Sequence, residues 1–249
     1  MIDSFICLDL ETTGLNPKTD KIIEIGAVRI ENGMETGTFE TFVNPGRLLD
    51  ERIVELTGIT DDDLKDAPLI AEVIPQFIEF TRDLPLLGHS VLFDFSFIKK
   101  AAVNQKLTFE RDGVDTLKIA RKYLPELPHR SLRYLCEYYG IEHHAHRALQ
   151  DAVATIKLHE ILWEQFGTRE MSVGASETTD VSENKKNSLF APAKLIYQAK
   201  KDSPITKSQK ERLYKLINQH KIKTAYDIDK LTKSEASRYT DLILAKYGR

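Results

Sequence analysis

The sequence has few of the features that mark secreted, metal-stapled or membrane-spanning proteins. Its 249 residues include only two cysteines, Cys7 and Cys136, both in apolar surroundings, which excludes a disulfide framework and a structural zinc site. The N-terminus has no basic stretch and carries acids by Asp9, unlike a signal peptide. No apolar run approaches about 18 residues, so no membrane span and no membrane partner are expected. A cytoplasmic protein is the resulting prediction.

The charges are unevenly distributed along the chain. A hydrophobic fraction of 41% and a charged fraction of 29% are typical of a globular protein. The formal net charge of -3 combines two unlike parts with a nearly neutral segment between them, residues 168–203, which carry 6 Lys and Arg against 5 Asp and Glu. Residues 1–167 carry 18 Lys and Arg against 28 Asp and Glu, a net charge of -10, whereas residues 204–249 carry 11 against 5, a net charge of +6. An acidic body is therefore joined to a basic tail.

The first third of the body has the pattern of strands. Residues 5–10 form a continuous apolar run with one acid inside, which favours a strand buried on both faces. Residues 22–30 and 37–43 read as two further strands, and Glu31-Asn32-Gly33 between them is typical of a hairpin turn. These segments predict an antiparallel meander.

The rest of the body alternates short strands with helices. Helical spacing covers 68–80, 93–103, 118–124, the segment after Ser131 to Gly140, and 147–166, with short strands at 84–88 and 114–117. Thr60, followed by three acids, has the pattern of a helix cap. Antiparallel strands followed by alternating strands and helices predict an α/β fold with a mixed β-sheet flanked by helices.

The chain is predicted to have three parts. Residues 168–187 lack apolar periodicity and are rich in Ser, Thr, Glu and Asn, which indicates a flexible linker. Helical spacing returns in 208–221 and 234–248. We therefore expect a domain at 1–167, a linker at 168–203, and a small basic helical module at 204–249.

Two acids lie at the end of the first strand. Asp9 and Glu11 are two residues apart, so their side chains point to the same face of the sheet. Two neighbouring buried carboxylates are costly without a cation, and no Lys or Arg is near in the sequence. A hard divalent metal ion would satisfy them. A strand end exposed to solvent is the alternative.

Three more residues have the types that a hydrolytic site needs. Asp94 lies in an apolar segment at a helix start, where it is either a capping acid or a functional one. Asp151 and His146 are five residues apart, too far around a helix to share a face. We expect His146 in the loop before the helix and Asp151 in the second turn. The small side chains of Ala148, Ala152 and Ala154 should keep this part of the helix slim and permit its close approach to the sheet. The neighbouring His143 and His144 are interpreted as ordinary loop histidines.

These motifs together resemble a known family. Asp9-Leu10-Glu11-Thr12-Thr13-Gly14, Gly88-His89-Ser90 through Phe93-Asp94, and His146-Arg147-Ala148-Leu149-Gln150-Asp151 are similar to the three motifs of the DEDDh 3′–5′ exonucleases. That group includes the proofreading epsilon subunit of bacterial DNA polymerase III. The resemblance covers about residues 4–166. It departs at Ser90, where relatives often have asparagine.

The resemblance implies a fold and a site. It implies a ribonuclease H-like fold in which Asp9, Glu11, Asp94 and Asp151 hold two Mg²⁺ or Mn²⁺ ions and His146 deprotonates the attacking water. Imidazole, with an ordinary pKa of about 6.5, suits that task near neutral pH. The products would be nucleoside 5′-monophosphates. Further substrate contacts are expected from Thr12, Thr13, Leu15, His89, Ser90 and Phe93.

The resemblance leaves substrate and partners open. DNA 3′ ends in proofreading, replication or repair are expected, with an exoribonuclease like RNase T and oligoribonuclease, or a catalytically silent polymerase-accessory module, as alternatives. A DNA polymerase or a sliding clamp is a possible partner. Lys186-Asn187-Ser188-Leu189-Phe190 resembles clamp-docking peptides but lacks their leading Gln, and packing onto a domain is the other interpretation. The basic module either follows a phosphate backbone or is a solvated basic face.

Overall fold

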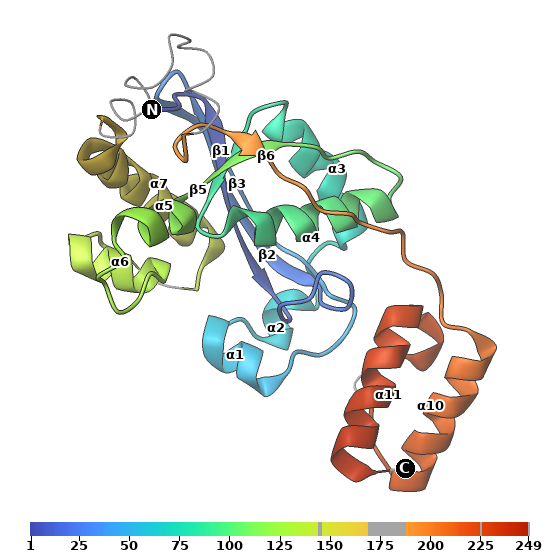
Figure 1. The fold of residues 1–249 in the computed structure, drawn as a ribbon. Helices are drawn as coiled ribbons and strands as arrows, with labels where there is room; N and C mark the ends of the chain where they lie inside the picture. The colour runs from blue at the N-terminus through green and yellow to red at the C-terminus, as the bar shows by residue number, and fades with distance from the viewer. Residues whose placement is uncertain (144–145, 169–187, 225, 249) are drawn as a thin grey trace.

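A computed structural model describes residues 1–143, 146–168, 188–224 and 226–248. One sheet of six strands forms the centre of the body, in the order β3-β2-β1-β4-β5-β6 (Figure 1). The strands are β1 (Phe5–Thr12), β2 (Ile22–Glu31), β3 (Met34–Phe42), β4 (Leu86–Gly88), β5 (Asp112–Asp115) and β6 (Ala193–Lys194). Strands β1 to β3 pair antiparallel, whereas β4 is parallel to both β1 and β5. The predicted meander and mixed sheet are confirmed.

Helices cover both faces of the sheet. Figure 1 shows α5 and α7 on one side and α3 and α4 on the other. The helices of the body are α1 (Glu51–Thr57), α2 (Asp61–Leu64), α3 (Ile70–Thr81), α4 (Val91–Asn104), α5 (Thr116–Tyr123), α6 (Leu132–Tyr139) and α7 (Ala148–Leu162), which continues as a π-helical turn η1 (Trp163–Gly167). In the described parts of the chain, none of the helices combines the length and apolar character that a bilayer crossing requires.

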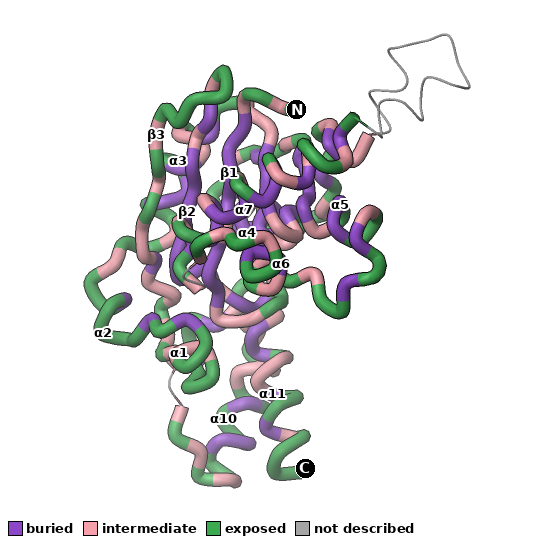
Figure 2. The backbone as a smooth tube through the Cα atoms, turned by 90° about the vertical axis from the view of Figure 1, so that its left-hand side faces the viewer, coloured by how far each residue is buried: buried purple, intermediate pink, exposed green. Residues whose placement is uncertain are grey.

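The core lies in two layers, one on each face of the sheet. Ile6, Leu8 and Leu10 of β1 face α3 and α4, and Phe5 and Cys7 face α5 and α7. Every residue of β1 except Asp9 is therefore buried, as the continuous apolar run predicted. Figure 2 shows buried backbone along β1, β2 and α7 and exposed backbone along much of β3.

Two elements were not expected from the sequence. Helix α1 has only seven residues, one of them buried, so it lacks a long apolar stripe, although Asp50 caps its start and Gly58 ends it in a left-handed conformation. Strand β6 pairs antiparallel with β5 through two residues, too few to show alternation. Strand β3 begins at Met34, three residues before the predicted start.

The second half of the predicted linker is packed against the body. Phe190 is 2% exposed and lies among the rings of Tyr123 and Trp163. Leu195 is buried in the core next to α3 and α4. Asp202 accepts hydrogen bonds from Lys100 Nζ (2.6 Å) and Asn104 Nδ2 (2.8 Å). These contacts favour packing onto the domain over clamp docking for the Leu-Phe pair, while 169–187, including Lys186 and Asn187, lie outside the described residues.

The basic tail forms its own small helical unit. It contains α10 (Lys207–His220), a 3-10 turn η3 (Ile228–Lys230) and α11 (Lys233–Tyr247). Leu213, Leu216 and Ile243 are among its buried residues, which form a cluster separate from the cores of the body. Thr206 and Thr232 start the two helices with reciprocal capping boxes. Figure 1 shows α10 and α11 side by side at one end of the molecule.

The close approach of α7 to the sheet depends on a glycine. A side chain at Gly26 of β2 would place its Cβ 2.0 Å from the backbone nitrogen of Leu149. Ala148, Ala152 and Ala154 of α7 are fully or almost fully buried, which confirms the expectation of a slim helix packed closely on the sheet. Gly26 lies directly opposite Asp9 in the ladder, so this contact sets the distance between Asp9 and α7.

Replacing Gly26 with alanine is expected to destabilise the fold, because backbone atoms of α7 would have to move. Overpacking of this kind costs about 1–3 kcal/mol, and we expect the upper end of that range. Urea unfolding measures the difference in the free energy of unfolding. Gly37→Ala is the matched control, since the atoms nearest to a Cβ there all belong to side chains, the flexible end of Arg29 at 3.3 Å and the ring of Phe80 at 3.5 Å. Equal losses in the two variants would contradict the role given to Gly26.

Candidate active site

Strand β1 carries two of the predicted site residues on one face. Asp9 lies opposite Gly26 and Glu11 opposite Glu24 in the β1–β2 ladder. Because side chains alternate along a strand, Asp9 and Glu11 project together to the side that α7 approaches. Asp9 is partly buried and Glu11 is 9% exposed, so the strand end is not open to solvent.

Helix α7 brings the third carboxylate. Asp151 is in the first turn of α7 and not in the second turn as predicted. The helix begins at Ala148, one residue after the predicted start at Arg147. Arg147 and Ala148 fix this end of the helix on β2, since Arg147 Nε and the Ala148 backbone N–H each donate a 3.1 Å hydrogen bond to Glu24. The strand and the helix are thereby held in one arrangement.

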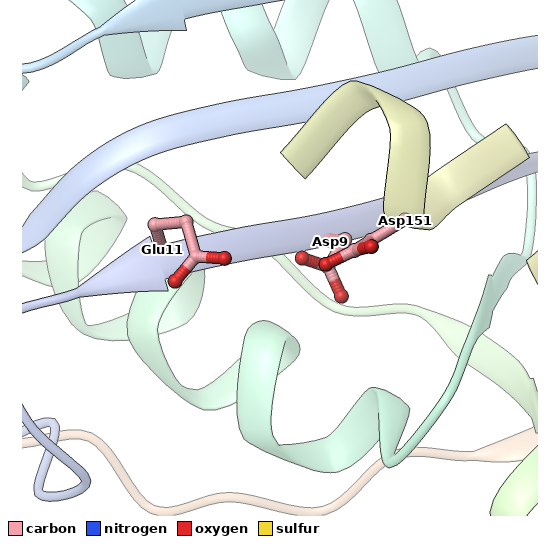
Figure 3. Close-up of side chains that lie close together, drawn as sticks. All are labelled: Asp9, Glu11 and Asp151. Atoms are coloured by element: carbon pink, nitrogen blue, oxygen red, sulfur yellow. The ribbon is translucent and has the colours of Figure 1, made fainter. Parts of the chain in front are cut away.

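Three carboxylates meet at this point. One oxygen each of Asp9, Glu11 and Asp151 lies within 4.8 Å of the others, and Figure 3 shows Asp9 next to Asp151 at the start of α7, with Glu11 further along β1. Burial, then the charges of Asp151 and Glu24, raise the pKa of Glu11 to about 8. Burial, followed by Asp94 and Asp151, also raises the pKa of Asp9 well above its usual range. The cluster thus favours a bound cation.

Asp94 lies beside this cluster but outside the group of three. It is 3% exposed in the first turn of α4. Burial raises its pKa well above the ordinary value, although hydrogen bonds from its own backbone and from Leu10 act in the opposite direction. Its charge is the largest electrostatic contribution to the raised pKa of Asp9. Asp94 is therefore close enough to influence the ionisation of Asp9.

Two histidines border the carboxylates. His146 lies before α7 as predicted, with Nδ1 3.9 Å from Glu11 Oε1 and a side chain that is 40% exposed. Its φ of 70° is uncommon for a residue other than glycine, and the Asp151 carboxylate accepts its backbone N–H at 3.2 Å. His143, which the sequence suggested was an ordinary loop histidine, instead has its Nε2 in contact with Asp151 Oδ1.

The loop after β1 carries the predicted contacts to the terminal nucleotide. Thr12 donates a 2.7 Å hydrogen bond to the carbonyl of Gly14. The Thr13 hydroxyl accepts from the Lys21 backbone N–H at 2.9 Å and from Arg47 Nη2 at 2.6 Å. Leu15 is 84% exposed. The structure therefore presents Leu15 to solvent, while the two threonines hold the loop.

The second motif was predicted to contact substrate through His89, Ser90 and Phe93, and the structure shows different contacts for each. Both ring nitrogens of His89 are engaged, Nδ1 with Thr116 Oγ1 at 2.9 Å and Nε2 with the Arg130 carbonyl at 2.8 Å. Burial lowers the pKa of His89, and these contacts favour a structural role over substrate contact. Ser90 directly precedes α4 with φ 78°, and Phe93 packs on Phe97 at 5.0 Å between ring centres.

The donor set fits a hard divalent ion. Carboxylate oxygens are the ligands that Mg²⁺ and Mn²⁺ prefer. Within the ranges that the structure describes, no Lys or Arg forms an ion pair with Asp9, Glu11 or Asp94; Arg147 instead pairs with Glu24 at 3.1 Å. The carboxylates are therefore not neutralised by lysine or arginine side chains of the described chain.

Sequence reasoning missed residues that support the site. Glu24 is 1% exposed, and its only sequence signal was an acid within a strand that otherwise reads as apolar. His143 had no signal beyond its closeness to His146. Arg47 lies in a loop far from every motif. These residues are brought in by the sheet register and by loop geometry, which short motifs do not encode.

The comparisons with known proteins agree with this geometry. The sequence profile described as Exonuclease (RNase_T) matches residues 6–159. The chain is 41% identical over 170 residues to the DNA polymerase III subunit epsilon of Aquifex aeolicus, covering 66% of this chain and 84% of that protein. It is 46% identical over 156 residues to the PolC-type DNA polymerase III of Caldanaerobacter subterraneus subsp. tengcongensis, covering 62% of this chain and 11% of that protein.

Further similarity extends beyond the body. The PolC-type DNA polymerase III of Oceanobacillus iheyensis is 34% identical over 246 residues, which cover 97% of this chain and 17% of that protein. The chain thus spans only a small part of the PolC-type relatives.

Solved structures share the fold. Exonuclease X in complex with 5′ overhanging duplex DNA has a TM-score of 0.52 at 24% identity, covering 66% of this chain and 93% of that one. Escherichia coli exonuclease I with a dA16 oligonucleotide has a TM-score of 0.60 at 22% identity, covering 70% and 43%. The fold is the ribonuclease H-like fold that the motifs implied. The profile match over more than half of the chain and the epsilon subunit relative show that this chain belongs to the DnaQ-like 3′–5′ exonuclease family.

Proposed function

We propose that this protein is a metal-dependent 3′–5′ exonuclease that hydrolyses DNA to nucleoside 5′-monophosphates during replication or its proofreading. The convergence of Asp9, Glu11 and Asp151 is the observation that carries the proposal. Burying three carboxylates between a strand and a helix costs free energy of folding, and two of them have clearly raised pKa values. Bound divalent ions would offset this cost by neutralising the charges.

We assign the metal ligands to Asp9, Glu11 and Asp151, with Asp94 beside them. Two Mg²⁺ or Mn²⁺ ions bound there would stabilise the charge on the attacking and leaving oxygens of a phosphodiester. His146, at the exposed rim of the cluster, would take the proton of the attacking water. Arg147 holds the start of α7 through Glu24 and so fixes the position of Asp151.

The choice of DNA rests on the relatives. The curated relatives include an epsilon subunit and PolC-type chains of DNA polymerase III, and two neighbouring structures hold DNA. These names support a DNA substrate and a DNA polymerase as partner. A sliding-clamp partner and a cytoplasmic location stay predictions, as do the domain boundaries at residues 167 and 203.

End-labelled substrates test the activity. The purified chain with Mg²⁺ is incubated with single-stranded DNA and RNA of the same sequence, labelled at the 5′ or the 3′ end. We expect a ladder that shortens from the 3′ end of DNA and a labelled mononucleotide from the 3′-labelled strand. Cleavage of RNA alone would favour the exoribonuclease alternative. Binding without cleavage would contradict both enzymatic readings and favour the silent accessory module.

The exposed lysines of the C-terminal helical unit are proposed to bind the DNA backbone. Exchange of the exposed Lys207, Lys215, Lys221 and Lys223 for glutamine is expected to weaken binding of long single-stranded DNA while leaving turnover at saturation unchanged. For single strands the slope of log affinity against log salt falls by about 0.7 for each phosphate that the protein no longer neutralises. Fluorescence anisotropy across a salt series measures this slope.

The control for this experiment removes a lysine charge from the body. Lys65 pairs with Asp62 on the surface, with 61% of its side chain exposed, and Lys65→Gln should leave the salt slope unchanged. If the four-lysine variant keeps the slope of the unmodified protein, the tail is only a solvated basic face.

A further inference from the structure

The loop between β1 and β2 is organised around one buried carboxylate. Asp20 accepts the backbone N–H of Asn16 at 2.9 Å, and only 3% of its side chain is exposed. A Cβ on Gly14 would lie 2.6 Å from Asp20 Oδ2, so the carboxylate packs directly against the backbone between Thr13 and Leu15. The position of Asp20 therefore sets the path of the loop that presents Leu15.

Two arginines hold this carboxylate, and one of them comes from the C-terminal helices. Arg47 Nη2 lies 3.5 Å from Asp20 Oδ1 and donates to Thr13 Oγ1 at 2.6 Å. Arg238 of α11 contacts Asp20 Oδ1 and donates to Thr19 Oγ1 at 2.9 Å. The loop is thus pinned from the body on one side and from α11 on the other.

A second acid, Glu235 of α11, completes the network. Glu235 is 5% exposed and pairs with Lys21 Nζ at 3.0 Å and with Arg47 Nη1 at 3.8 Å. Arg47 Nη1 also donates to the Tyr239 hydroxyl at 3.2 Å. Each acid of the network therefore has two cations near it, and the charges of α11 complement those of the body. Buried charges of this kind become costly when one partner is removed.

We propose that Glu235 and Arg238 are positioning residues for the substrate-binding loop at 13–21, acting through Arg47 and Asp20. The C-terminal helices thus order the loop that meets the terminal nucleotide, in addition to any interaction with distant phosphates. This inference rests on the proposed function for its catalytic consequence. A different reading is that the network only anchors the helices, with the loop unaffected.

Amide hydrogen exchange distinguishes ordering of the loop from mere anchoring of the helices, and it does not require an active enzyme. In Arg238→Glu, an acid faces Asp20, and we expect the amides of residues 13–21 to exchange at least about tenfold faster, as the removal of a charged hydrogen bond implies. Arg238→Lys keeps the charge and should restore most of the protection. Arg82→Glu is the matched control, because Arg82 pairs with Glu31 on the surface with 60% of its side chain exposed.

Kinetics on a dinucleotide test the catalytic consequence. A dinucleotide is too short to extend along the C-terminal helices, so a change in KM reports on the loop. We expect Arg238→Glu to raise KM about tenfold and to keep kcat within about twofold. A wild-type protein that degrades no substrate would contradict the proposed function, while the exchange measurement would still decide on the loop.

The inference is overturned if faster exchange in Arg238→Glu is confined to α11 and loop 13–21 keeps its protection. It is also overturned if KM for the dinucleotide does not change while the loop is loosened. Should Arg238→Glu fail to fold, Glu235→Gln removes one charge without introducing another, and the same loop amides are expected to lose protection to a smaller degree.

Discussion

Asp151→Asn is expected to abolish measurable turnover while leaving the fold intact. The substitution keeps the size of the side chain and its ability to accept the His146 N–H, but it removes one of three converging charges. Removal of one group that stabilises transition-state charge costs about 10²–10³-fold in kcat, and removal of a metal ligand should cost at least as much. Single-turnover cleavage of a 3′-labelled strand measures the rate.

Although Asp151→Asn should lose its turnover, its stability without metal should not fall. Removing one negative charge relieves the repulsion that raises the pKa of Asp9 and Glu11, so the melting temperature without metal should stay equal or rise. Asp62→Asn, at a side chain that is 89% exposed, serves as the matched control for both measurements. A turnover rate within tenfold of the unmodified protein would show that the assigned ligand set is wrong.

Magnesium is expected to stabilise the protein much more at alkaline than at acidic pH. The folded-state pKa of Glu11 is about 8, against an ordinary value of 4.5. The folded protein therefore holds a proton between these two values that the unfolded chain has released, so metal-free stability rises as pH falls through 8. Metal needs the ionised carboxylate, so Mg²⁺ affinity should fall about tenfold for each pH unit below that value.

Thermal unfolding with a Mg²⁺ titration at several pH values measures this coupling. The shift in melting temperature at a fixed Mg²⁺ concentration should shrink steadily as pH is lowered from about 8.5 to about 6. Glu11→Gln cannot titrate, so it should raise metal-free stability at alkaline pH and flatten much of the dependence. A Mg²⁺ shift that is independent of pH would contradict a buried carboxylate ligand with a raised pKa.

The central strands and the three converging carboxylates could be predicted because their signals are local. The run around Asp9 reads as a buried strand, and the two-residue spacing to Glu11 puts both acids on one face. The placement of His146 before a helix followed from helix geometry alone. Ala148 and Ala152 predicted that this helix would be slim, although not that Gly26 is the residue it packs against.

The remaining features depend on interactions between distant parts of the chain. Arg47 and Glu235 are 188 positions apart in the sequence and meet only because the C-terminal helices dock beside the first loop. No periodic pattern marks such a pair. Helix α1 escaped prediction because it buries a single residue. The docking of α11 also changes the expected picture of a module joined only by a tether.

Strand β6 limits where the chain can be shortened to obtain the body alone. It covers the outer edge of β5 with two residues that directly follow Pro192, and short strands next to proline resist pairing with other chains. A protein shortened after Gly167 would lose this cover together with Phe190, leaving the backbone of β5 open at the margin of the sheet. Such a fragment is expected to self-associate, so a body that stays monomeric should include β6.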